Sequence, residues 1–340
     1  QVVQGGAGQA PARQAALNGG VPPEVACMTI NKVCGSGLKA VMLAAQSIRA
    51  GDQHVVIAGG MESMSHTPYV IRGAKTGFKF GHQKLDDIMI SDGLWCSFKN
   101  WHMGNAAELT GKKDGIGREE QDKFAYNSHT KSVAAQKGGK FKAETFDVLI
   151  PQRKGDPILV ETDEGVRPGT TMESLGSLRP AFDKDGTVTA GNASQLSDGA
   201  SAVVLMSRAE AERRGVAPLG EFVSYGMVAG PDSASLLHQP SRAIMKAAEK
   251  AGIAVADLDL FEINEAFAAV GLASIAELGI SDEIVNVNGG AIALGHPLGA
   301  TGAFLMTKAL YELERTGGRY ALISMCCGGG LGTGTIIERL

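Results

Sequence analysis

The alternation of apolar and polar positions predicts strands and amphipathic helices that follow one another along the chain. Residues 25–31 form a short apolar run typical of a buried strand. After a turn, apolar residues recur at helical spacing from Leu38 onward, and 54–58 predicts a second strand that stops at the glycines 59–60. A strand, a helix and a strand of this length predict a crossover between parallel strands.

The same order of parts recurs near the other end of the chain. Residues 284–288 predict a strand, 289–299 a glycine-rich turn, 300–314 a helix, and 321–325 a strand that precedes CCGGG at 326–330. We interpret the two copies as duplicated α/β halves. On organisation alone, the alternative that any α/β protein holds several such units is equally acceptable.

A segment of different amino-acid composition separates the two copies. Residues 64–190 carry many turn signals, which favours an inserted domain lying mostly at the surface. Within this segment we expect helices at 86–92, 105–110 and 118–137. After it we expect strands at 200–206, 220–228 and 258–263 and helices at 208–214 and 241–251. The predicted domains are an N-terminal half of 1–63 with 196–217, a loop domain of 64–195, and a C-terminal half of 218–340.

Composition narrows the class of protein. The formal net charge is −4 and no dense cluster of Lys and Arg occurs, so nucleic acid is not an expected partner. No apolar run reaches about 18 residues, so no membrane span is expected. The five cysteines are odd in number and form no CxxC pair, which favours free thiols in a reducing compartment over a disulfide framework.

Cys34 is the first candidate for chemistry. It lies between the end of a predicted strand and the start of a helix, in VCGSG. The free N–H groups of a helix start favour an anion, which predicts a stabilised thiolate, and the nearby glycines let an acyl carbonyl approach the backbone. The alternative is a small cysteine packed under a sheet, the usual fate of cysteines.

His296 and Cys326 are further candidates. His296 stands between glycine and proline before a helix, where it is suited to deprotonate the cysteine or to hydrogen-bond a carbonyl. A capping histidine in a glycine-rich turn is the alternative. Cys326 ends a strand next to three glycines, where a thiol can exchange a proton with carbon or sulfur. Cys327 would point to the opposite side, and spacing alone does not choose between the two.

Other polar residues give weaker signals. Asn264 and Glu265 follow an apolar strand and could orient a water or a histidine, although we prefer Glu265 as a carboxylate at a helix start. His102 has no partner in the sequence and is interpreted as structural on the residues alone. The histidines lack the spacing of metal ligands, and neither a dinucleotide fingerprint nor a P-loop occurs.

Together these motifs resemble the thiolase family over essentially the whole chain. The segments are NKVCGSGLK (31–39), GGMESMS (59–65), NEAF (264–267), GGAIALGHPLGATG (289–302) and SMCCGGGLG (324–332). The resemblance implies a five-layered αβαβα fold of two similar halves with an inserted loop domain. Family members have about fifty more residues before this start, which supply the first strand and helix of the N-terminal half. Either the numbering omits these residues, or the protein is shortened and a sheet edge is exposed.

The resemblance also implies a role for each candidate. Cys34 takes the acyl group, and His296 activates it and later polarises a thioester carbonyl. Cys326, two residues before Gly328, is the acid/base cysteine, and Cys327 is a bystander. Asn264 holds a water that shares one oxyanion hole with His296. The N–H groups of Cys34 and Gly328 form the other.

The same resemblance assigns the contacts with coenzyme A to the loop domain and the segment that follows it. By position these are Leu94, His102, Met103, Ser174, Leu178, Phe182, Ala190, Ser194 and Ala266. His102 belongs to a segment that resembles one lining the site in short-chain members. Coenzyme A and acyl-CoA are expected as substrates, with no tightly bound cofactor and no metal.

The implied activity is that of an acetyl-CoA acetyltransferase, which makes or cleaves 3-ketoacyl-CoA through acyl-Cys34 in a cytoplasmic homodimer or homotetramer. A mitochondrial location stays open. A broader-chain degradative thiolase is the main alternative, because 228–240 replaces a loop common in acetoacetyl-CoA members. A ketoacyl synthase would lack Cys326. An inactive CoA-binding homologue is disfavoured because all the candidate catalytic residues are present.

Overall fold

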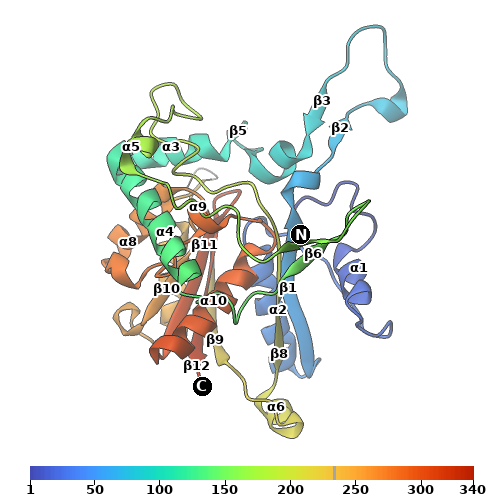
Figure 1. Ribbon diagram of the computed structural model, residues 1–340, viewed down its shortest axis with the longest axis vertical. Helices are drawn as coiled ribbons and strands as arrows, with labels where there is room; N and C mark the ends of the chain where they lie inside the picture. Colours follow the sequence, from blue (N-terminus) through green and yellow to red (C-terminus); the bar gives the residue numbers. More distant parts are fainter. Residues whose placement is uncertain (233–234) are drawn as a thin grey trace.

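The structure, a computed structural model, describes residues 1–232 and 235–340. Two helices lie at its centre, α2 (Ser36–Ala50) and α10 (Thr301–Thr316), and they contact each other and a sheet on either side (Figure 1). Both predicted helices are therefore confirmed. They approach closely at glycines, because a Cβ added at Gly302 would lie 2.3 Å from the amide nitrogen of Leu38. The starts of the two helices are thereby brought together.

The larger sheet has four strands in the order β10-β11-β12-β9. Strands β10 and β11 are parallel, and the other two pairs are antiparallel. Helix α7 (Gln239–Ala251) and helix α8 (Ala268–Leu278) pack on the face away from α10, around Phe261 and Leu322. The sheet is covered on both faces, which is why its central strands are apolar along their length. The strand bounds are Gly220–Ala229 (β9), Leu260–Ile263 (β10), Tyr320–Cys327 (β11) and Leu331–Arg339 (β12).

The smaller sheet pairs β1 (Val55–Ser63) with β8 (Asp198–Met206) in antiparallel register. The predicted strand end at 59–60 is wrong, because both glycines pair with β8. They serve close packing instead, since a Cβ at Gly60 would lie 1.7 Å from the carbonyl oxygen of Gly299. One face of the sheet packs on the central helices, and the other exposes Ile57 and Val204.

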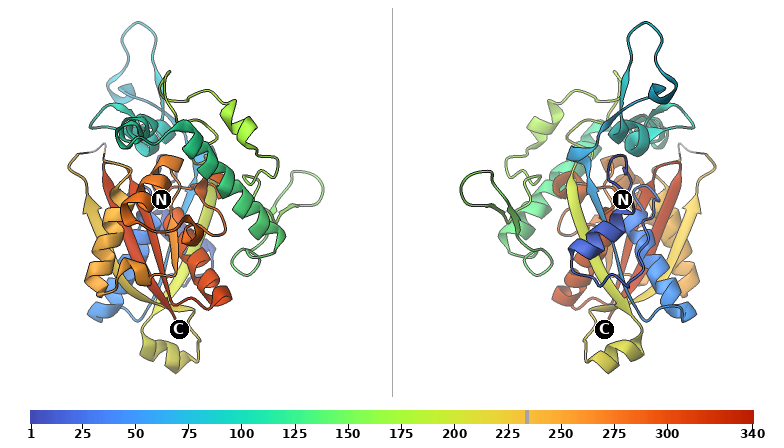
Figure 2. Two further views of the ribbon diagram at one scale, coloured as in Figure 1. Left: turned by 90° about the vertical axis from the view of Figure 1, so that its left-hand side faces the viewer. Right: turned by 90° about the vertical axis from the view of Figure 1, so that its right-hand side faces the viewer.

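In order, the layers are α7 with α8, the four-stranded sheet, α2 with α10, and the two-stranded sheet (Figures 1 and 2). The predicted α/β architecture is confirmed, and these elements form four of the five expected layers. Each half of the chain contributes one sheet and one central helix, which places the starts of α2 and α10 and the end of β11 at one end of the layers.

The strand predicted at 25–31 is not formed, and with it the predicted parallel crossover to β1 is wrong. The segment is extended without regular pairing, and its apolar residues Val25 and Met28 are 46% and 67% exposed. An apolar run forms a strand only where a neighbouring strand accepts its hydrogen bonds, and the described residues place none beside it.

The strand predicted at 284–288 is also wrong. Residues Asp282–Ile284 form a short 3₁₀ helix, η5, and only Val285 bridges to β10. Asn286 has a φ of 45° and uses its side chain in place of a strand backbone. Its Oδ1 accepts from the N–H of Ile263 at 2.9 Å, and its Nδ2 donates to the carbonyl of Ile263 at 2.8 Å. The edge of β10 is thereby satisfied without a strand.

The inserted segment crosses one end of the layers. Helices α3 (Met103–Asp114) and α4 (Arg118–Lys137) contact α8, and α4 also contacts α9 (Ala291–Leu294). The helix predicted at 118–137 is confirmed, and 105–110 lies within α3. The helix predicted at 86–92 is wrong. Strand β3 (Leu85–Asp87) occupies its first part, because it pairs with β2 (Tyr69–Ile71), and a π-helical segment, η3 (Met89–Leu94), occupies the rest.

Two hairpins extend from the layered core, β2–β3 and β6–β7 (Figures 1 and 2). The predicted helix 208–214 is confirmed as α6, and 241–251 lies within α7. The segment 228–240 contains residues 233–234, which lie outside the described residues. Across 1–232 and 235–340, no helix has both the length and the apolarity needed to cross a membrane. The remaining bounds are Pro11–Asn18 (α1), Arg208–Arg214 (α6), Met172–Gly176 (α5), Val148–Ile150 (β6), Ile158–Val160 (β7), Trp95–Cys96 (β4) and Trp101–His102 (β5).

Candidate active site

Cys34 occupies a tight turn directly before α2. Val33 has a φ of 50°, a left-handed conformation that is rare and costly for a β-branched residue. The hydroxyl of Ser36 stabilises the turn, because it accepts from the N–H of Lys32 at 2.8 Å and donates to the carbonyl of Val33 at 2.7 Å. Strain held in this way at a predicted nucleophile indicates a turn shaped for function.

The sulfur of Cys34 receives two backbone N–H groups, its own and that of Gly328. The structure thus brings together the two residues predicted to form one oxyanion hole. The expected low pKa is wrong, however. Burial raises the pKa of Cys34 to about 12, and the nearby Cys327 adds to the rise, while the N–H groups lower it only in part. The resting group is a neutral thiol, so its proton has to leave as the acyl carbonyl arrives.

His296 is held on three sides by side chains. Its Nδ1 lies 2.6 Å from the hydroxyl of Thr301, its backbone N–H donates to Ser197 at 3.2 Å, and its Nε2 lies 3.3 Å from Nδ2 of Asn264. The Thr301 hydroxyl donates to the carbonyl of Pro297 at 3.0 Å. We therefore assign the imidazole proton to Nδ1, which leaves the Nε2 lone pair facing Asn264.

The buried imidazole makes an acid-sensitive contribution to stability. Burial lowers the pKa of His296 from 6.5 to about 4. Between these pH values the unfolded chain binds a proton at this residue and the folded chain does not, so stability falls as pH falls through that window. A shift of this size corresponds to about 3 kcal/mol.

We expect His296→Gln to reduce this loss of stability. The difference in unfolding free energy between pH 7 and pH 4 should be smaller in the variant than in the wild type, by up to about 3 kcal/mol. Urea unfolding at the two pH values measures it. His129 also has a pKa lowered to about 4, by burial and by Arg167. His129→Gln is therefore the matched comparison, because it removes another histidine with a similarly lowered pKa. Equal acid sensitivity in wild type and the His296 variant would contradict a buried neutral imidazole.

Asn264 and Cys326 lie at the ends of neighbouring strands. Asn264 follows β10, and its N–H donates to the carbonyl of Ser324 in β11 at 2.9 Å, two residues before Cys326. Asn264 is 1% exposed, and within the described part of the chain its Oδ1 has no hydrogen-bond partner. A buried amide oxygen of this kind favours a polar ligand or a water at the site, in agreement with the role that the resemblance implies.

The two neighbouring cysteines face opposite sides of β11, as predicted. Cys327 lies in the core with α2, and a Cβ at Gly35 would be 2.8 Å from its sulfur. Cys326 lies instead among residues of the inserted segment, including Met103. Burial, then Cys34 and Cys327, raise the pKa of Cys326 well above its ordinary value. A Cβ at Gly328 would lie 3.1 Å from Val33, so the end of β11 that carries Cys326 reaches the Cys34 turn.

The loop that carries His296 reaches the Cys34 turn. Leu298 belongs to the same apolar cluster as Val33 and Cys34. A Cβ at Gly37 would lie 2.8 Å from the carbonyl oxygen of Gly299, so the loop and the start of α2 are in direct backbone contact. Three segments therefore meet at one place in the structure: the His296 loop, the Cys34 turn and the end of β11.

The residues predicted to contact coenzyme A fall into three groups. Leu94 packs in the cluster of Cys34. Met103, Phe182 and Ala266 pack in the cluster of Cys326. His102 and Ser194 contact members of this second group, and the other three positions line a separate cavity. His102 stacks on Phe182 at 4.7 Å and caps α3 by accepting from Gly104 at 3.1 Å, and the N–H of Ser194 donates to the carbonyl of Ala266 at 3.1 Å.

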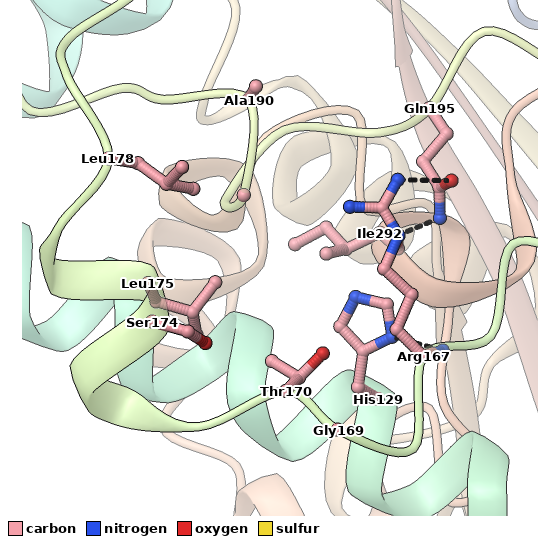
Figure 3. A pocket seen from close by; sticks show the side chains of 11 residues that line it. His129, Arg167, Gly169, Thr170, Ser174, Leu175, Leu178, Ala190, Gln195 and Ile292 are labelled. Atoms are coloured by element: carbon pink, nitrogen blue, oxygen red, sulfur yellow. Dashed lines mark hydrogen bonds between the residues drawn. The ribbon is translucent and has the colours of Figure 1, made fainter.

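Ser174, Leu178 and Ala190 line a cavity of about 250 Å³ (Figure 3). Its other walls include His129, whose Nδ1 accepts from the N–H of Arg167 at 3.3 Å. The sequence interpretation missed the other lining residues, because they are spread over the inserted segment and α9 and no local motif marks them. The missed lining residues are His129, Arg167, Gly169, Thr170, Leu175, Gly191, Gln195 and Ile292.

Two buried carboxylates hold the site loops in place. Glu62 accepts from the N–H groups of Val2, Val3 and Gly299 at 2.9–3.1 Å. It ties the end of β1 to the His296 loop.

The second carboxylate, Glu265, accepts from Ser128 at 2.6 Å, from Asn286 at 2.9 Å and from the N–H of Ile292 at 3.1 Å. Glu265 is therefore a carboxylate at a helix start, as predicted. The helix is α9, however, and not the helix that follows Glu265 in the chain.

Comparison with known proteins agrees with this geometry. Residues 1–209 match the family model "Thiolase, N-terminal domain", and residues 216–339 match "Thiolase, C-terminal domain". The chain belongs to the thiolase family. The resemblance drawn from the motifs is confirmed, and with it the prediction of an enzyme of this class.

Relatives named "Acetyl-CoA acetyltransferase" match along the full length of the chain. The protein of Cupriavidus necator is 53% identical over 339 residues, that of Pseudomonas aeruginosa 52% over 339 residues, and that of Shinella zoogloeoides 51% over 340 residues. Each match covers 100% of this chain and 86% of the relative. A relative from Staphylococcus epidermidis, 49% identical, is named "Probable acetyl-CoA acyltransferase".

The described residues contain no group of three or more His, Cys, Asp or Glu side chains arranged to hold a metal ion. The polar side chains that converge at the site are two thiols, an imidazole and an amide. Such a set suits acyl transfer to sulfur and proton transfer at carbon.

Proposed function

We propose that this thiolase is an acetyl-CoA C-acetyltransferase that makes or cleaves 3-ketoacyl-CoA through an acyl group on Cys34. The observation that carries the proposal is the convergence of two thiols with a fixed imidazole. Cys34 receives two backbone N–H groups. Cys326 ends the strand that reaches the Cys34 turn, and His296 is paired with Asn264 at the end of the adjoining strand. The names of the full-length relatives support the same activity.

In the cleavage direction, Cys34 attacks the 3-keto carbonyl of the substrate. Its proton passes to Nε2 of His296, which is unprotonated in the assigned tautomer and exchanges its contact with Nδ2 of Asn264 for this proton. The negative charge on the former keto oxygen is accepted by the N–H groups of Cys34 and Gly328, which already point at the sulfur. Because the resting thiol has a pKa of about 12, this proton transfer and the attack have to proceed together.

The carbon–carbon bond then breaks, and the electron pair moves to the α-carbon of acetyl-CoA as an enolate. The protonated Nε2 of His296, with Asn264 beside it, donates to the enolate oxygen. Cys326 is a neutral thiol at rest and supplies the proton to the α-carbon. Acetyl-CoA leaves, and Cys34 keeps the remaining acyl group as a thioester.

The second half-reaction returns every group to its starting state. The thiol of coenzyme A gives its proton to the Cys326 thiolate, and its sulfur attacks the acyl group on Cys34. The new acyl-CoA leaves, and the Cys34 sulfur takes its proton back from His296. The same steps in reverse join two acetyl groups, so the residues do not fix the direction.

We assign coenzyme A to the surface between the two clusters and the cavity. Leu94, Met103, Phe182 and Ala266 are the apolar contacts nearest the two sulfurs, while His102 and Ser194 shape that wall. Ser174, Leu178 and Ala190 contact the more distant part of the ligand at the cavity. An extended, largely apolar arm suits such a series of separate contacts. Coenzyme A is a substrate in this scheme, not a resident cofactor.

We expect acetoacetyl-CoA to be the best 3-ketoacyl-CoA substrate. Phe182 and Phe267 meet edge to face at 6.2 Å and, with Met103, enclose the Cys326 side of the site. Lengthening the acyl chain should therefore lower kcat/KM for CoA-dependent cleavage. A series of 3-ketoacyl-CoA substrates of increasing chain length measures it. A maximum at a longer chain would support the broader-chain alternative, and no cleavage of any member would contradict the proposed activity.

Two alternatives are less well supported. A ketoacyl synthase requires no second thiol at the site, whereas Cys326 is buried at the end of the strand that reaches the Cys34 turn. An inactive homologue would have no reason to hold His296 through Thr301, Ser197 and Asn264. The expected assembly is a homodimer or homotetramer, with acetyl-CoA and 3-ketoacyl-CoA as the small-molecule partners. All five cysteines are described and are free thiols, which favours the cytoplasm.

A further inference from the structure

Gln195 contacts both the cavity and the segment that leads to His296. Its Oε1 accepts from Nη2 of Arg167 at 3.3 Å on the cavity wall (Figure 3). Its Nε2 donates to the carbonyls of Ile292 at 2.9 Å, Ala293 at 3.2 Å and Gly165 at 2.9 Å. The amide orientation is thereby fixed, since a flipped amide would turn its oxygen toward three carbonyl oxygens.

Ser197 completes the same arrangement two residues later. Its hydroxyl donates to the carbonyl of Gln195 at 2.9 Å and accepts from the N–H of His296 at 3.2 Å. A Cβ at Gly295 would lie 2.2 Å from this hydroxyl, so the backbone before His296 is packed directly on it. Gln195 and Ser197 together therefore contact the segment 292–296 at Ile292, Ala293 and His296.

The segment needs such support because it contains little regular structure of its own. Helix α9 is only four residues long and ends at Gly295, whose φ is 94°. Its carbonyls at Ile292 and Ala293 gain no further helical partners, so their hydrogen bonds come from the side chain of Gln195. A short helix that leads into a functional histidine depends on such outside contacts for its position.

We propose that Gln195 is a positioning residue for the acyl-transfer reaction, which fixes His296 through the carbonyls of Ile292 and Ala293 and through Ser197. The inference rests on the proposed function of this site. Gln195 itself does not contact His296, so its effect is on the placement of the imidazole and not on the chemistry of any one proton transfer. A displacement of about 1 Å at a reacting group costs on the order of 10²-fold in rate.

The test uses Gln195→Met, which keeps the length of the side chain and removes both its donors and its acceptor. We expect kcat for cleavage of acetoacetyl-CoA to fall by about tenfold or more, with KM within about twofold and the melting temperature nearly unchanged. Gln136→Met is the matched control. Its Nε2 donates to the carbonyl of Asp163 at 3.5 Å, two residues before Gly165, and within 1–232 and 235–340 it makes no hydrogen bond to 292–296. The control should keep the wild-type kcat.

Two further variants separate positioning from substrate binding and from general loss of structure. Arg167→Met removes the cation from the cavity wall and should raise KM with a smaller effect on kcat. Ser197→Ala should lower kcat, and the double variant with Gln195→Met should lower it by less than the product of the two single effects, because both act on one segment.

The outcomes are distinguishable. A wild-type enzyme that cleaves acetoacetyl-CoA while Gln195→Met keeps full kcat would overturn the inference and leave the proposed function standing. A fall in kcat that only follows a fall in melting temperature, or multiplicative effects of the two substitutions, would also overturn it. A wild-type protein without any cleavage activity would overturn the proposed function and this inference with it.

Discussion

Cys34→Ser should reduce the cleavage of acetoacetyl-CoA by about 10³-fold or more. The hydroxyl of serine is a far weaker acid than a thiol, and burial already raises the pKa of the native thiol to about 12. His296, whose pKa is lowered to about 4, is too weak a base to remove the hydroxyl proton. The turn itself should survive, because Ser36 and the backbone hold it. Steady-state kinetics and a thermal melt measure the two effects.

Cys27→Ser is the matched control for this variant. Cys27 is a free, half-buried thiol in the segment before the turn, and its sulfur lies 3.6 Å from the carbonyl of Val25. The same replacement of sulfur by oxygen there should leave kcat and KM at their wild-type values. Substantial activity in Cys34→Ser, or an equal loss in Cys27→Ser, would show that the nucleophile lies elsewhere.

Cys326→Ser should separate the two half-reactions. When acetyl-CoA acylates Cys34, Cys326 protonates the leaving CoA sulfur, and water can replace it there because a thiolate is a good leaving group. Proton exchange at the α-carbon, by contrast, depends on the Cys326 thiol itself. We therefore expect acylation of Cys34 to persist, while acetoacetyl-CoA synthesis and cleavage fall by about 10²–10⁴-fold, the usual range for loss of a general acid–base group. Exchange of the acetyl-CoA α-protons with deuterated water should fall in parallel.

Cys327→Ser is the control that decides between the neighbouring thiols. Cys327 lies in the core beside α2, with Nζ of Lys32 at 3.9 Å from its sulfur. Its replacement should lower the melting temperature, because a buried hydroxyl replaces a thiol, but should retain carbon–carbon chemistry. Loss of α-proton exchange in Cys327→Ser together with its retention in Cys326→Ser would reverse the assignment.

The sequence predicted the helices of this chain better than its strands. Helices α2, α4 and α10 have a regular spacing of apolar residues that one chain segment displays by itself. The segments 25–31 and 284–288 have equally apolar residues, yet neither forms a strand. In the first case no neighbouring strand is described, and in the second the side chain of Asn286 takes over the hydrogen bonds of Ile263. A strand depends on its partner, which a single segment does not reveal.

In the candidate site, too, the sequence marks some residues and not others. Cys34, His296 and Cys326 stand in glycine-rich motifs, and the sequence identifies them as candidates. The residues that hold these groups in place are ordinary polar residues far away in the chain, such as Glu62, Ser197 and Gln195. Their roles depend on carbonyls and N–H groups that only the folded chain brings within reach. The pKa of Cys34 was misjudged for a related reason, because a helix start is visible in the sequence and the burial of a sulfur is not.

The most direct test of the account is to mix acetyl-CoA with the Cys326→Ser variant and to map the modified peptide by mass spectrometry. Without the acid–base thiol, the acetyl group should remain where it is first transferred. The account predicts one acetyl group, on the peptide that contains Cys34. An acetyl group on Cys327 or on any other residue, or no acetyl group on a variant that still binds acetyl-CoA, would contradict it.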